Sequence, residues 1–297
     1  MPASTRATTP ERRPAGEALA GPTTLELRGI DFTSRPTRRK PIVLACGRWA
    51  EADLDAAPVL RLTELRQLAT PEAYADALAE PGPWLAGCDL PFGLPRELVE
   101  ALGWPTEWPA LMDHYAALDR ATIRATFSAF CAARPAGAKF AHRACDRPAG
   151  SSPSMKWVNP PVAYMLHAGV PPLRAAGCEL PGLTAGDPSR RALEAYPGLL
   201  ARELIGRRPY KSDDRARQST DQAAARAQIV AALEAGASRL GLRLQLDAEQ
   251  RAALLSDPQG DALDATLCLL QAAWASRQPA WGWPAGVDPV EGWILTA

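Results

Sequence analysis

The chain has 297 residues, 47% of them hydrophobic, which is enough to bury a large core and excludes a wholly disordered chain. Its 33 basic and 33 acidic residues balance, which excludes a protein that binds polyanions through its net charge alone. No apolar run approaches the ~20 residues that a membrane-spanning helix needs. We therefore expect a protein without a membrane segment, and any polyanion must bind at a local patch.

The six cysteines are scattered along the chain, with no C-x-x-C pair and no histidine at zinc spacing. This usage indicates a reducing, cytoplasmic setting and excludes a zinc motif. Residues 1–23 lack the apolar segment of a secretory signal and are predicted to form a disordered tail. Residues 24–297 are predicted to form a single α/β domain.

The first predicted strand is TLELRGID, in which apolar and polar residues alternate up to Asp31. The short apolar runs at 42–45 and 59–62 predict two antiparallel partner strands, and a helix is expected over 71–79. The next strand covers 84–88, and the following Pro-Phe-Gly-Leu-Pro ends it directly after Asp89. Two carboxylates are thereby placed at strand ends.

Residues 104–188 have an irregular pattern, which predicts a mainly helical and irregular insertion with helices at 108–133 and 162–168. The segment RRALEAYP then predicts a strand that ends at Glu194, because Pro197 cannot continue it. A helix over GLLARELIG and a long Ala-rich helix over 213–236 follow. The third strand end therefore also carries a carboxylate.

The last predicted helix contains GDALDATLCLLQAAWASR and is apolar enough to be buried. Asp261 and Asp264 lie three residues apart, so they share one face of this helix near its N-terminus. A helix-capping role would account for an acidic residue at Asp261, which directly follows Gly260, without any metal. Asp264 lies beside the apolar face, where an unpaired carboxylate is costly unless a cation or a donor meets it.

These acids form a candidate metal site, because Mg²⁺ and Mn²⁺ prefer oxygen ligands and need only a few carboxylates from separate elements. Two such ions ~3.5 to 4 Å apart activate a water and stabilise the leaving oxygen of a phosphodiester displacement. The candidate ligands are Asp31, Asp89, Glu194, Asp261 and Asp264. Asp31 is the strongest candidate and the expected bridge between both ions.

Five strings resemble an uncharacterised family of predicted nucleases, domain of unknown function 429: GIDFTSRPTRRKP, CDLPFGLP, EAYP, PYK and GDALDA. The resemblance spans the chain from Gly29 to about Ala275. It implies a ribonuclease H-like fold: a mixed sheet of three antiparallel strands and then parallel strands, flanked by helices. It also implies a catalytic role for the five acids above.

Basic residues supply further candidates. Lys211 in PYK either offsets negative charge that develops in the transition state or pairs structurally with Glu194 or Asp213. The polar span KFAHRACDRPAGSSPSMKW either clamps a phosphate or is a surface loop. The substrate-binding candidates are Arg39, Lys139, His142, Arg143, Arg147 and Lys156.

Three functions compete. The first is a metal-dependent nuclease or phosphodiesterase acting on DNA or RNA by a two-metal mechanism. The second is a non-catalytic ribonuclease H-like module that binds nucleic acid or protein and keeps its acids for structure. The third, phosphoryl transfer on an actin-like fold, is disfavoured because no Gly-rich phosphate loop follows the early strands. The substrate, the pathway and the oligomeric state stay open.

Overall fold

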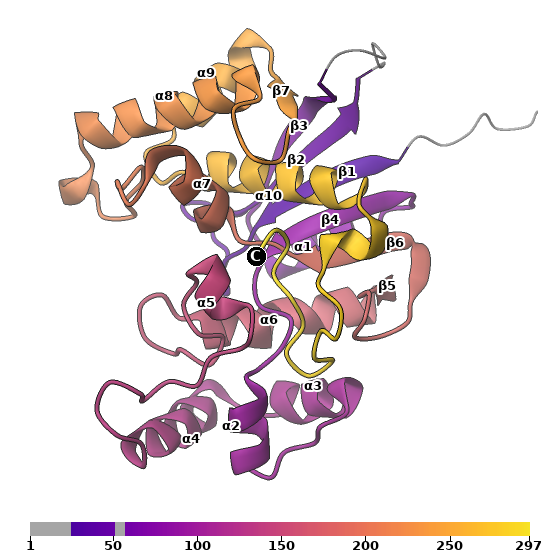
Figure 1. Cartoon of the computed structure of the whole chain (residues 1–297), viewed down its shortest axis with the longest axis vertical. Coiled ribbons are helices and arrows are strands. Elements are labelled where there is room, and N and C mark those ends of the chain that lie inside the picture. Colours follow the sequence, from indigo (N-terminus) through magenta and orange to yellow (C-terminus); the bar gives the residue numbers. More distant parts are fainter. Residues whose placement is uncertain (1–24, 51–56) are drawn as a thin grey trace, which may run out of the picture.

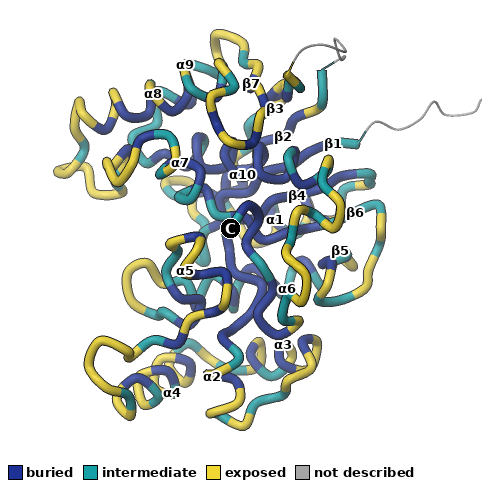
Figure 2. Tube along the Cα trace, in the orientation of Figure 1, coloured by how far each residue is buried: buried dark blue, intermediate teal, exposed yellow. Residues whose placement is uncertain are grey.

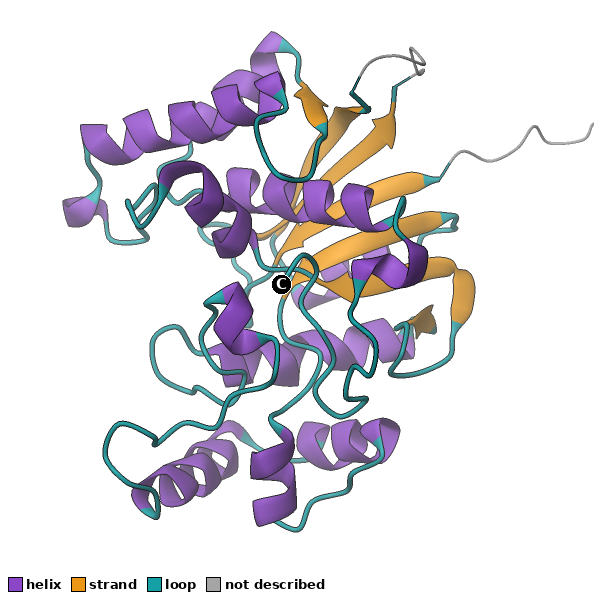
Figure 3. Cartoon of the chain, viewed as in Figure 1, coloured by secondary structure: helices purple, strands orange, loops and turns teal. Residues whose placement is uncertain are grey.

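The computed structural model describes residues 25–50 and 57–297, which contain a seven-stranded sheet with helices on both faces (Figure 3). The strands are β1 (Glu26–Asp31), β2 (Ile42–Trp49), β3 (Val59–Leu68), β4 (Trp84–Asp89), β5 (Cys178–Glu179), β6 (Asp187–Glu194) and β7 (Arg243–Gln245). The predicted tail, residues 1–23, lies outside the described residues.

The sheet has the order β5-β6-β4-β1-β2-β3-β7, with β1 at its centre. β1 pairs with β2 in the antiparallel sense and with β4 in the parallel sense. β2 and β3 are antiparallel, whereas β4 and β6 are parallel. This arrangement confirms the expected fold class, an α/β protein with a ribonuclease H-like mixed sheet. The short strands β5 and β7, which the sequence pattern did not predict, extend its two edges.

Helices cover the sheet in two layers (Figure 1). The helices are α1 (Pro71–Ala79), α2 (Arg96–Ala101), α3 (Trp108–Ala116), α4 (Arg120–Ala132), α5 (Asp146–Ala149), α6 (Val162–Ala175), α7 (Pro197–Ile205), α8 (Thr220–Ala235), α9 (Ala248–Ser256) and α10 (Asp261–Ala275), with short 3₁₀ turns η1 (Arg215–Arg217) and η2 (Pro279–Gly282). α1 and α6 share a core with one face of the sheet, and α7 to α10 share a second core with the other face. α2, α3 and α4 lie beyond α6, away from the sheet (Figure 1).

α10 lies directly on the centre of the sheet, and two glycines permit its close approach. A Cβ built on Gly29 of β1 would lie 2.0 Å from the carbonyl oxygen of Ala265, and one on Gly87 of β4 would lie 2.6 Å from that of Cys268. α10 is buried on nearly all sides, as Figure 2 shows, which explains its long apolar run. Its N-terminus, which carries the acids, is fixed by this contact.

Three predicted helices differ from the observed ones. The helix expected over 108–133 is two helices, because the Asp119 side chain accepts a hydrogen bond from the Thr122 N–H and starts α4 anew. α6 continues through Pro171 and Pro172 to Ala175. Buried apolar packing along α6 outweighs the donors that these prolines remove. The long helix begins only at Thr220, after the capping box of Ser219.

The span that we predict as an insertion, residues 104–188, contains α3 to α6 and β5. Except for its last two residues, which begin β6, it lies between β4 and β6, and these two strands pair directly in the sheet. Figure 2 shows many exposed residues on α4 and on the loops around it. In the part of the chain that the structure describes, no helix is long and apolar enough to cross a membrane.

Candidate metal centre

Three carboxylates from three elements meet at the end of the central strands. Asp31 ends β1 and Asp89 ends β4, and the two residues are register partners in the parallel pair. α10 adds Asp264 from its first turn. One oxygen of each carboxylate lies within 4.8 Å of the others. We call these three residues the acidic centre.

The acidic centre gathers negative charge in a desolvated place. Asp264 is fully buried, Asp31 is 7% exposed and Asp89 is half-buried. Burial, followed by the charge of Asp264, raises the pKa of Asp89 to about 7. Burial also raises the pKa of Asp31, against the lowering effect of Lys211. A cation placed between these carboxylates would offset both the cost of burying their charges and their mutual repulsion.

A lysine and a tyrosine meet the innermost carboxylate. The Tyr210 hydroxyl donates a 2.6 Å hydrogen bond to Oδ1 of Asp264, and the Lys211 ammonium pairs with Oδ2. The Lys211 side chain is 39% exposed, so it reaches the buried acid from the solvent side. Lys211 therefore pairs with Asp264, and not with Glu194 or Asp213 as the structural alternative expected. The sequence analysis did not single out Tyr210, although it stands within the same PYK string.

Glu194 lies at the end of β6 but outside the acidic centre. Its carboxylate accepts hydrogen bonds from two nitrogens of Arg143, at 2.7 and 2.6 Å, and from the Phe92 N–H at 2.9 Å. Burial raises the pKa of Glu194, and the charge of Arg143 opposes that rise. The charge of Glu194 is thus already matched within the protein.

Arg143 is a buried part of the scaffold, with 2% of its surface exposed. Its guanidinium nitrogens all donate: to the carboxylates of Asp146 and Glu194 and to the carbonyl oxygen of Glu291. The five N–H donors of an arginine are thereby used inside the protein. Its predicted contact with a substrate would require one of these bonds to break.

Asp261 faces a different cation. Its Oδ1 accepts a 2.6 Å hydrogen bond from Lys40, which also binds Asp213. The cap expected from Asp261 is supplied instead by Asp257, whose carboxylate accepts from the Ala262 N–H, because Gly260 takes the N-cap position. Asp261 therefore stands one turn before the acidic centre, beside it and not within it.

A cavity of about 470 Å³ opens over the acidic centre. Its wall includes Asp31, Asp89, Asp264, Lys211 and Glu194. Of the predicted substrate-binding residues, it includes Arg143. Those that do not line it are Arg39, Lys139, His142 and Arg147, which are exposed, and Lys156, which is half-buried.

The fold and this cluster define the class of the protein: a ribonuclease H-like α/β protein with an acidic site that could hold a metal ion. The chain belongs to the family described as "Protein of unknown function (DUF429)", whose family model matches residues 29–287. No curated protein and no solved structure matches the chain.

Proposed function

We propose that the protein is a divalent-metal-dependent nuclease or phosphodiesterase whose acidic centre holds Mg²⁺ or Mn²⁺. One observation carries the proposal: three carboxylates from β1, β4 and α10 converge to within 4.8 Å. The donor set fits such an ion, because it offers only hard oxygen ligands. The ammonium of Lys211 already occupies one side of the cluster, which indicates that the site favours positive charge.

Ions bound here would supply an activated water and a charge that stabilises the leaving oxygen of a phosphodiester. In the proposal, Asp31 is the central ligand, and Asp89 and Asp264 complete the set. In the same proposal, Lys211, which lines the cavity over the acidic centre, attracts the phosphate oxygens and offsets the charge that develops on them. Glu194 and Asp261 lie outside this ligand set, where they pair with Arg143 and Lys40 respectively.

The test compares wild type with Asp31→Asn, which keeps the shape of the side chain and removes its charge. Asp76→Asn is the matched control, because Asp76 is an exposed acid on α1. Cleavage of labelled single-stranded, double-stranded and hybrid substrates is measured with EDTA, Mg²⁺ or Mn²⁺, beside thermal melting under the same conditions.

We expect wild type and Asp76→Asn to cut and to melt at a higher temperature with metal, because an ion that binds only the folded state stabilises it. Asp31→Asn should lose both responses. Full cleavage by Asp31→Asn would refute the proposal. No metal response and no cleavage in wild type would favour the non-catalytic binding module.

A further inference from the structure

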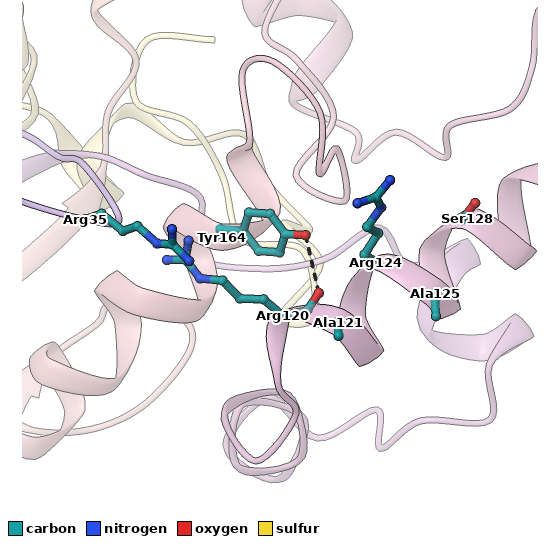
Figure 4. Close-up of a pocket in the computed structure, with 7 residues that line it drawn as sticks. All are labelled: Arg35, Arg120, Ala121, Arg124, Ala125, Ser128 and Tyr164. Atoms are coloured by element: carbon teal, nitrogen blue, oxygen red, sulfur yellow. Dashed lines mark hydrogen bonds between the residues drawn. The ribbon is translucent and has the colours of Figure 1, made fainter.

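A second cavity, of about 540 Å³, is rich in arginine (Figure 4). Its lining residues are Arg35, Arg120, Ala121, Arg124, Ala125, Ser128 and Tyr164. Three of these are arginines and none is acidic, and we call this site the arginine pocket. Of these residues, Arg35 lies within the string GIDFTSRPTRRKP, which carries the family resemblance.

Within the described residues, no ion pair matches the charge of the arginine pocket. In the described parts of the chain, none of its three arginines forms an ion pair with a carboxylate. Burial and the charge of Arg35 both lower the pKa of Arg120. Arg120 also starts α4, where the helix dipole disfavours a cation. A bound anion would offset the burial of the Arg120 charge, its repulsion by Arg35 and its unfavourable interaction with the helix dipole.

One arginine of the pocket is held in place before any ligand arrives. Arg120 donates a 3.0 Å hydrogen bond to the carbonyl oxygen of Ser34, and its guanidinium carbon lies 4.9 Å from the ring centroid of Tyr164. The Tyr164 hydroxyl donates to the carbonyl oxygen of Arg120 at 3.3 Å. Arg35 and Arg124 are exposed, so their N–H donors can meet a ligand from solvent. Guanidinium groups suit phosphate oxygens because they donate in a planar fork.

The arginine pocket adjoins the cavity over the acidic centre. Ser34 lines that cavity and Arg35 lines the pocket, while on α6 Met165 lines the cavity and Tyr164 the pocket. Arg35 follows Asp31 by four positions, so their Cα atoms are at most roughly 14 Å apart. Phosphates of one nucleic-acid strand recur every ~3.4 Å along a duplex axis. The backbone of Arg35 is therefore within a few nucleotide steps of that of Asp31.

We propose that the arginine pocket binds a backbone phosphate of the same nucleic-acid strand whose scissile phosphodiester lies at the acidic centre. This inference rests on the proposed function and deepens it, because it makes the substrate a DNA or RNA strand and not a small phosphodiester. Phosphate contacts carry no base information, so binding is independent of sequence and strongly dependent on salt.

The test is the double variant Arg35→Gln/Arg124→Gln, whose two side chains are exposed. The matched control is Arg61→Gln/Arg243→Gln, two exposed arginines at the β3–β7 edge of the sheet. Binding of fluorescein-labelled DNA and RNA oligonucleotides is measured by anisotropy in EDTA, over a series of salt concentrations. We expect roughly tenfold weaker binding in the pocket variant. The salt slope should fall by about one for each phosphate that the variant no longer neutralises. The control should bind like wild type.

Cleavage in Mn²⁺ separates this inference from the proposed function. The pocket variant should have a raised KM for an oligonucleotide and an unchanged rate on a small chromogenic phosphodiester, which is too short to reach the pocket. Unchanged oligonucleotide binding and KM, with cleavage by wild type, would overturn the inference and leave the proposed function standing. If the pocket variant bound oligonucleotides more weakly but wild type cleaved none of the substrates, the proposed function would be overturned. The pocket would still be a site of contact with the nucleic-acid strand. If inorganic phosphate displaced the labelled oligonucleotide as effectively as an unlabelled oligonucleotide does, the inference that the substrate is a polymer would be overturned.

Discussion

Lys211 offers the most direct probe of the acidic centre, through the variant Lys211→Met. The variant keeps much of the aliphatic side chain and removes the charge that faces Asp264. Loss of one partner of a buried ion pair costs about 3–5 kcal/mol, whereas exposed pairs contribute about 0–1 kcal/mol. Asp264 is 0% exposed and the Lys211 side chain 39%. We therefore expect an intermediate loss of about 2 kcal/mol of unfolding free energy without metal.

The assay is thermal melting of wild type, Lys211→Met and the exposed control Lys139→Met, each in EDTA and in saturating Mg²⁺. For a chain of 297 residues, a loss of about 2 kcal/mol corresponds to a fall in Tm of roughly 3 °C, because the unfolding entropy is about 2.1 cal/mol/K per residue. In Mg²⁺ the fall should shrink, because the ion supplies the missing positive charge and binds the variant without competition from the ammonium. Lys139→Met should melt like wild type in both buffers.

The comparison between EDTA and Mg²⁺ tests whether Lys211 and the metal ion share the acidic centre. An equal fall in Tm with EDTA and with Mg²⁺ would show that Lys211 and the metal do not share the acidic centre. A variant as stable as wild type in EDTA would show that Asp264 does not depend on the ammonium, and the reasoning from burial would be refuted.

Two further substitutions test how the scaffold holds the site. Gly29→Ala would place a methyl group 2.0 Å from a backbone oxygen of α10. We expect a loss of about 3 kcal/mol or more in urea unfolding, and near-wild-type stability would contradict the close approach of the helix. Arg143→Met leaves Glu194 buried without its partner, so a loss of about 3–5 kcal/mol is expected. The double variant with Glu194→Gln should recover part of it, and a purely additive loss would argue against direct coupling.

The sequence alone determined the central strands and the elements that carry the acids. Alternating or continuous apolar residues followed by Asp or Pro mark β1 and β4, and the apolar length of α10 marks a buried helix. These signals are local, because strand and helix periodicity is written in neighbouring residues. The order of the motifs then led to the fold class, through the family that they resemble.

Only the tertiary structure decided which of the five candidate acids meet. Asp31, Asp89 and Asp264 converge because β1 and β4 are parallel neighbours in register and α10 lies across them. Glu194 has an equally suggestive place at a strand end, yet Arg143, 51 positions away in the chain, pairs with it. The residues around Glu194 in the sequence do not show that Arg143 lies next to it in the folded chain. The same holds for the arginine pocket, whose members come from the loop after β1, from α4 and from α6. Charge pairing across long sequence separations is a property of the packed chain, which is why the sequence supplies the candidates and the fold selects among them.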